Sequence, residues 1–192
     1  MGTELPRRNL LKALPLTAAG LVLAASETSA EQRPAEAGRI LVAHYSRTGN
    51  TAVIARQIRR AMDATLFDIK TETPYPEDYE ATVEQARRET QSQYLPPLGH
   101  FAADIGRYDT IYLGMPIWGM TAPPVIRSFL RAHDLSGKVV IPFITHGGYG
   151  LGNSIDVLRA HMPGADLRPA FSMEADQERR TLARVSGWLA EN

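Results

Sequence analysis

Residues 40–51 read I-L-V-A-H-Y-S-R-T-G-N-T, an apolar run that ends in a cluster of hydroxyl and amide side chains. Consecutive apolar residues are typical of a strand that is buried on both faces of a parallel sheet. Residues 51–62 then carry apolar side chains at helical spacing. The stretch therefore predicts a strand, a short polar loop and a helix, which is the repeating unit of an α/β fold.

The same alternation continues to the end of the chain. Strands are expected at 40–43, 65–69, 110–115, 138–145 and 167–172, and helices at 51–62, 76–91, 124–133, 153–161 and 175–189. Pro169 interrupts the last of these strands and favours a position at the edge of the sheet. The pattern predicts an α/β doubly wound sheet, in which ligands bind beyond the carboxyl ends of the strands.

The composition narrows the classes of function. Hydrophobic residues make up 44% of the 192 residues, which is enough for a sizeable core. Lys plus Arg and Asp plus Glu are equal at 21 each, and the absence of a basic patch argues against nucleic acid as the main partner. The chain has no Cys, so disulfides and thiolate catalysis are excluded, and no pattern of His and carboxylates indicates a metal site.

The first thirty residues have the layout of a signal peptide. Basic residues (Arg7, Arg8 and Lys12) precede an apolar stretch at 13–25 and small residues that lead up to Ala30. The Arg7-Arg8 pair resembles the twin-arginine export signal of bacteria. The sequence therefore predicts export to the periplasm, with residues 1–30 as signal, 31–38 as a polar linker and 39–192 as one domain. A helix on the membrane surface or an uncleaved anchor is the alternative, but the apolar stretch is short for a membrane span.

The loop after the first strand has the residues of a phosphate site. A helix N-terminus offers unpaired N–H groups and a partial positive charge, and a glycine lets the backbone curl around an anion. Hydroxyl and amide side chains add further donors. The candidate residues are Ser46, Arg47, Thr48, Gly49, Asn50 and Thr51. Ordinary capping of the helix is the alternative, because Ser, Thr and Asn also cap helices without any ligand.

Two further loops follow expected strands. The first contains Pro116, Ile117, Trp118 and Gly119, and its indole is suited to stack on a planar ligand. The second contains His146, Gly147, Gly148, Tyr149 and Gly152, whose glycines allow close backbone approach and whose phenol offers a second ring. A Trp buried only for packing and a plain glycine-rich turn are the alternatives.

Three motifs occur in this order at the expected strand ends: S-x-T-G-N-T at 46–51, P-I-W-G at 116–119 and T-H-G-G-Y-G-x-G at 145–152. With them, residues 39–190 resemble the short-chain, flavodoxin-like family of FMN-binding proteins. The resemblance implies a parallel sheet of five strands in the order 2-1-3-4-5 with helices on both faces. It also implies that the residues at 46 and 48–51 hold the FMN phosphate and that the flavin lies between the Trp118 and Tyr149 loops.

The charge of the chain differs from that of electron-carrier flavodoxins, which are usually strongly acidic. Neither expected flavin loop contains Asp or Glu, and negative surroundings are what hinder the formation of an anionic reduced flavin. We therefore expect easier full reduction and a protein of the reductase type. His146 is a candidate catalytic residue that donates a proton to the flavin or to a quinone.

These residues predict an exported FMN-binding oxidoreductase or electron-transfer protein. Candidate partners are a quinone, a nicotinamide cofactor, an electron-transfer protein and a second copy of the chain; the mature form is not expected to span the membrane. One alternative is a flavodoxin-type carrier that serves a protein partner. The other is a binding module that keeps the fold without redox activity.

Overall fold

Strand β1 (Ile40–His44) lies inside a parallel sheet and pairs with a strand on each side. The computed structural model describes residues 39–174 and 178–191. In it, β1 runs parallel to β2 (Thr65–Asp68) and to β3 (Thr110–Pro116). The side chains of 41–43 are buried because helices cover both faces of the sheet, as the apolar run predicts.

The sheet continues from β3 to β4 (Val139–His146) and from β4 to β5 (Asp166–Leu167). The resulting order β2-β1-β3-β4-β5, with all pairs parallel, confirms the predicted topology. A short strand β6 (Phe171–Glu174) pairs with the second half of β4.

The predicted strand at 167–172 is wrong in its detail, because the structure has two short strands there. The N–H of Arg168 still donates to the carbonyl of Val140 at 2.9 Å. Pro169 has no N–H to continue the ladder, so the chain leaves the sheet and rejoins it at Phe171. The predicted edge position of the proline is correct.

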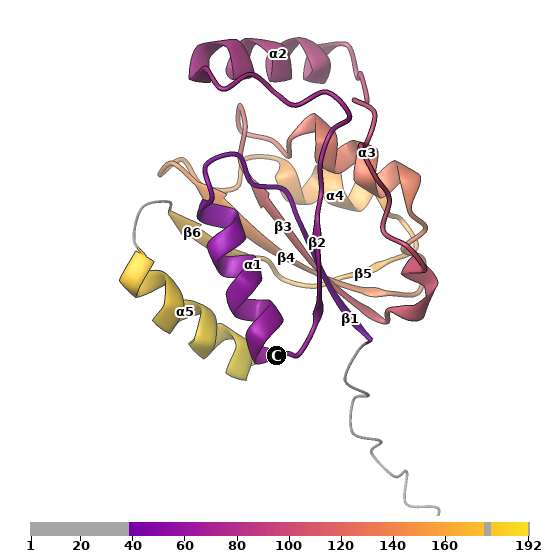
Figure 1. Ribbon diagram of the computed structural model, residues 1–192, viewed down its shortest axis with the longest axis vertical. Helices are drawn as coiled ribbons and strands as arrows, with labels where there is room; N and C mark the ends of the chain where they lie inside the picture. Colours follow the sequence, from indigo (N-terminus) through magenta and orange to yellow (C-terminus); the bar gives the residue numbers. More distant parts are fainter. Residues whose placement is uncertain (1–38, 175–177, 192) are drawn as a thin grey trace, which may run out of the picture. The chain divides into compact units, whose positions relative to one another are not determined.

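Two pairs of helices cover the sheet (Figure 1). Helices α1 (Asn50–Ala61) and α5 (Glu178–Ala190) lie on one face, where Ile54 packs with Tyr112 and Phe143 in one core cluster. Helices α3 (Pro124–Ala132) and α4 (Ser154–His161) lie on the other face, over a cluster that contains Ile111 and Phe129. The sheet is therefore buried from both sides, as a doubly wound fold requires.

Helix α2 (Tyr79–Gln91) is placed differently from the other helices. It lies across the carboxyl ends of the strands, above the sheet in Figure 1, instead of along a sheet face. The helix begins at Tyr79, later than the predicted position 76, because the Asp78 carboxylate caps it by accepting from the N–H of Ala81 at 2.8 Å. The helix thus covers the edge where the loops of the predicted site lie.

The predicted signal peptide at 1–30 and linker at 31–38 lie outside the described residues, so both stay predictions. Within the described ranges, no helix is both long and apolar enough to cross a membrane.

His133, at the end of α3, links this helix to the loop before β3 through both of its ring nitrogens. Nδ1 lies 2.8 Å from the carbonyl of Phe129, so it carries the proton, and Nε2 accepts from the N–H of Ala102 at 3.0 Å. Protonation of Nε2 would remove this acceptor. Burial accordingly lowers the pKa of His133, although the hydrogen bond to Phe129 opposes the shift.

We predict that the free energy of unfolding falls as the pH is lowered through about 6.5, the ordinary pKa of histidine. Below this pH the unfolded chain binds a proton that the folded His133 resists, so acid favours the unfolded state. Urea unfolding between pH 8 and pH 5 measures the effect. His133→Gln should make the dependence shallower but not abolish it, because burial also lowers the pKa of His44. An unchanged dependence in the variant would contradict this account.

Candidate functional site

The loop between β1 and α1 turns sharply so that its backbone N–H groups converge. Gly49 has a φ of 93°, a left-handed conformation that favours glycine. The hydroxyl of Ser46 accepts from the N–H of Gly49 at 3.2 Å and of Ala52 at 3.3 Å. In the described part of the chain, no residue accepts from the N–H groups of Asn50 and Thr51. Two donors at the start of α1 are therefore available to a ligand.

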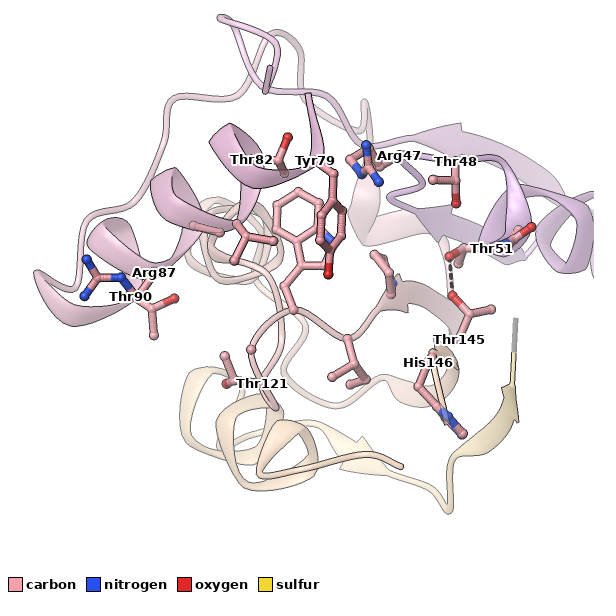
Figure 2. Close-up of a pocket in the computed structure, with 18 of the residues that line it drawn as sticks. Arg47, Thr48, Thr51, Tyr79, Thr82, Arg87, Thr90, Thr121, Thr145 and His146 are labelled. Carbon is pink, nitrogen blue, oxygen red and sulfur yellow. Dashed lines mark hydrogen bonds between the residues drawn. The ribbon is translucent and has the colours of Figure 1, made fainter. Parts of the chain in front are cut away.

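A hydrogen bond between two buried hydroxyls joins this loop to the end of β4. The oxygens of Thr51 and Thr145 lie 2.8 Å apart, and the two residues are 1% and 4% exposed. The bond is drawn as a dashed line in Figure 2. Thr145 was not among the predicted site residues. The sequence signal that could have found it is a hydroxyl that directly precedes the predicted His146 loop.

The Trp118 loop is a rigid hairpin. Trp118 and Thr121 exchange backbone hydrogen bonds of 3.0 and 3.2 Å. Both residues between them, Gly119 and Met120, have positive φ values of 57° and 65°, which is the geometry of a type I′ turn. Positive φ is unusual for a methionine, and the paired flanking residues hold it there. The indole therefore has a fixed position, and it lies beside Tyr45 at the end of β1.

Two tyrosines pack edge-on against this indole. The ring centroid of Trp118 lies 5.4 Å from that of Tyr45 and 4.9 Å from that of Tyr75, with interplanar angles of 87° and 86°. The Tyr75 hydroxyl donates to the Glu89 carboxylate of α2 at 2.6 Å, and Glu89 is only 7% exposed. Burial, with this hydrogen bond, raises the pKa of Tyr75, so the phenol stays neutral. The cluster thus connects α2 to the Trp118 loop.

The glycine-rich loop after β4 lines the cavity with only part of its length. His146 and Gly147 line the cavity, whereas Gly148, Tyr149 and Gly152 do not, and Tyr149 is 80% exposed. A Cβ at Gly152 would overlap the carbonyl of Met120, to which Asn153 donates at 3.0 Å. Gly152 therefore lets two loops meet. Whether the tyrosine or these two glycines contact a ligand stays a prediction.

A cavity of about 540 Å³ lies between the loops and α2 (Figure 2). Thr48, Thr51 and Thr145 lie toward one end of it, whereas Arg87 and Thr90 lie toward the other. The loops contribute Arg47, Thr48, Asn50, Thr51, Pro116, Ile117, Trp118, Gly119, Thr121, Thr145, His146 and Gly147. Of the residues predicted in the loop after β1, Ser46 and Gly49 do not line the cavity but shape the turn that does.

Helix α2 forms the opposite wall, which the sequence analysis missed. Its lining residues are Tyr79, Thr82, Val83, Ala86, Arg87, Thr90 and Gln91, which recur at helical spacing on one side of the helix. Spacing alone does not reveal that this side faces the loops, because the helix would present the same stripe to a sheet. The guanidinium of Arg87 forms a bidentate pair with Glu84 of the same helix.

The lining carries no carboxylate. Its charged or titratable side chains are Arg47, Tyr79, Arg87 and His146. Arg47 lies with its guanidinium 5.6 Å from the ring centre of Tyr79, and no described carboxylate forms an ion pair with it. The cavity is therefore suited to an anionic ligand. In the described ranges, no group of three His, Asp or Glu side chains is placed to hold a metal ion.

The His146 ring is oriented by its own loop. Its Nδ1 accepts from the N–H of Gly148 at 3.2 Å. In the neutral ring the proton is then on Nε2, which leaves that nitrogen as a hydrogen-bond donor.

Solved structures with the same fold include two from Bacteroides. A protein from Bacteroides uniformis that is assigned as a flavoprotein is 30% identical, with a TM-score of 0.69 over 79% of this chain and 99% of that chain. Another from Bacteroides eggerthii is 31% identical, with a TM-score of 0.69 over 80% of this chain and 96% of that chain. No curated protein matches the chain.

A flavoprotein from Lactobacillus acidophilus, solved in complex with FMN, is 22% identical, with a TM-score of 0.64 over 76% of this chain and 98% of that chain. At this identity the likeness shows the fold alone. The family profile described as flavodoxin matches residues 39–191, almost the whole region after the predicted linker. The chain therefore belongs to the flavodoxin family.

Proposed function

We propose that the chain binds FMN in this cavity and works as an electron-transfer flavoprotein. The observation that carries the proposal is the start of α1, where the N–H groups of Asn50 and Thr51 and the hydroxyl of Thr48 have no acceptor or donor among the described residues. These groups meet at one end of a cavity that has no carboxylate in its lining. A phosphate monoester would satisfy them.

The remaining residues fit the rest of FMN. The fixed Trp118 loop, with Pro116, Ile117 and Gly119, offers an apolar wall for a planar ring, and residues 145–147 offer a second wall. Membership of the flavodoxin family and the FMN complex of the Lactobacillus acidophilus protein support this assignment. Arg47 at the edge of the cavity offsets part of the phosphate charge.

FMN, when bound, supplies the redox chemistry, since it accepts and releases electrons. The chain's own residues do three things. The Trp118 loop and α2 exclude water, the start of α1 holds the phosphate, and Nε2 of His146 is placed on the cavity lining as a proton donor. His146 is the only imidazole among the described residues that line the cavity.

A small-molecule acceptor such as a quinone is favoured over a purely protein partner by the α2 wall. The cavity extends beyond the phosphate end to a helix whose lining residues include Tyr79, Val83 and Ala86. A planar apolar acceptor would contact such a wall. The donor is either a reduced nicotinamide or, if the protein acts outside the cytoplasm, a membrane quinol or a redox protein.

We also propose that the protein is exported by the twin-arginine route. The support is the sequence of residues 1–30, with Arg7-Arg8 before an apolar stretch. This route carries proteins that have already folded, which suits a protein that binds its cofactor in the cytoplasm. The mass of the chain recovered from the periplasm tests the proposal, since cleavage after Ala30 would remove the first thirty residues.

We predict that the apoprotein binds FMN far more tightly than riboflavin, which lacks the phosphate. Thr48→Val should weaken FMN binding about 10- to 100-fold, because a hydrogen bond to a charged group contributes about 1.5–3 kcal/mol. Riboflavin affinity should stay unchanged. Fluorescence titration of both flavins measures the ratio.

The matched control is Thr90→Val, which makes the same change at the opposite end of the cavity (Figure 2). It should leave the ratio of the two affinities as in the wild type. Equal affinities of the wild-type protein for FMN and riboflavin would reject the phosphate site. A wild-type protein that binds neither flavin would favour the alternative of a binding module without redox activity.

We predict that Val83→Asp slows electron transfer from the reduced holoprotein to a soluble quinone by about tenfold or more, because a charge on this wall is costly to cover with an apolar ligand. FMN affinity should be retained. Stopped-flow oxidation measures the rate. The matched control is Ala81→Asp, which places the same charge on an exposed position of α2 outside the lining. This variant should not change the rate of oxidation. Equal rates in both variants would instead favour a carrier with a protein partner.

A further inference from the structure

Arg127 of α3 lies directly behind the cavity wall. Its Nη2 donates to the hydroxyl oxygen of Thr121 at 3.2 Å, and Thr121 lines the cavity. Arg127 itself is not part of the lining and is half-buried. One hydroxyl group therefore separates a guanidinium from the space in which we propose that the flavin binds.

This guanidinium has no negative partner in the described part of the chain. Other arginines, such as Arg39, Arg87 and Arg159, form ion pairs with carboxylates, whereas Arg127 forms none. Its Nε is buried without any hydrogen-bond partner. Burial lowers the pKa of Arg127, but a guanidinium stays charged in proteins.

A half-buried charge without a partner is unfavourable for the folded protein, because the guanidinium loses water and gains no carboxylate in return. Its field is also less screened by salt than that of a surface arginine. The cavity lining adds no carboxylate that would cancel this field. Arg127 therefore contributes a positive potential to the cavity next to Thr121, and this contribution favours a ligand on which negative charge develops.

We propose that Arg127 stabilises the negative charge that the bound flavin gains on reduction, and so raises its reduction potential. This role rests on the proposed binding of FMN. A charge near the flavin ring is one of the means by which a protein tunes this cofactor. The rival explanation is structural: Arg127 only holds the Trp118 loop in place through Thr121. The two differ in which redox form of the flavin they affect.

The test compares three variants of the FMN-loaded protein. Arg127→Gln removes the charge, and Arg127→Lys keeps it. Arg131→Gln removes an exposed arginine one turn further along the same helix and is the matched control. The measurements are the reduction potential of the bound FMN and the dissociation constant of oxidised FMN; together they give the affinity for the reduced form.

Arg127→Gln should weaken the binding of reduced FMN about tenfold more than the binding of oxidised FMN. This difference lowers the reduction potential by about 59 mV for a one-electron couple. Arg127→Lys and Arg131→Gln should stay near the wild-type potential. Arg127→Met is a second neutral variant if Arg127→Gln folds poorly.

Three results would overturn the proposal. If Arg127→Gln weakened the binding of oxidised and reduced FMN equally, with no change in potential, Arg127 would act only by holding the Trp118 loop in place. The same shift in Arg131→Gln would show a general effect of net charge. A wild-type protein that does not bind FMN would reject the proposed function itself, and this role of Arg127 with it.

Discussion

The parallel register of β1, β3 and β4 is the constraint on which the rest of the structure depends. Pairing of His44 with Gly114, and of Pro116 with Thr145, brings the ends of these strands to one edge of the sheet. Loops that are far apart in the sequence then meet at this edge because the strands that precede them pair, and the loops themselves carry no sequence pattern that predicts the meeting. The Thr51–Thr145 hydrogen bond is a consequence of this register, because it requires the first and third loops to end at the same level.

Helix α2 turns this edge into a cavity. A helix on a sheet face is held by a broad apolar contact, but α2 has few apolar side chains, and its buried residues are Thr82, Ala86 and Glu89. The buried hydrogen bond from Tyr75 to Glu89 stabilises its position, and the Tyr45–Tyr75–Trp118 cluster lies beneath. The wall of the cavity is thus fixed by polar contacts and aromatic edges. Such contacts leave no periodic pattern in a sequence.

This difference explains what could be predicted from the sequence. The buried strands and the three loops could be predicted, because apolar runs and glycine or hydroxyl clusters are local features. The break at Pro169 was only partly foreseen, since a proline shows that pairing is disturbed but not where it resumes. The α2 wall and the hydrogen bond between Arg127 and Thr121 depend on which side of an element faces the cavity, and that is set by packing.

The electrostatics of the site depend both on the residues that line the cavity and on the residues that lie behind this lining. The lining itself carries no carboxylate, which the sequence indicated for two loops. The positive charge of Arg127 lies behind the lining, where Thr121 covers it and water reaches it poorly. The two cations on the lining, Arg47 and Arg87, face any anion that enters the cavity, and water that reaches them weakens their field. A cation behind the wall acts instead on charge that appears inside the cavity, because the low dielectric around it carries the field inward. In the proposed arrangement, the start of α1 would hold the phosphate in both redox states, whereas Arg127 would favour the reduced state.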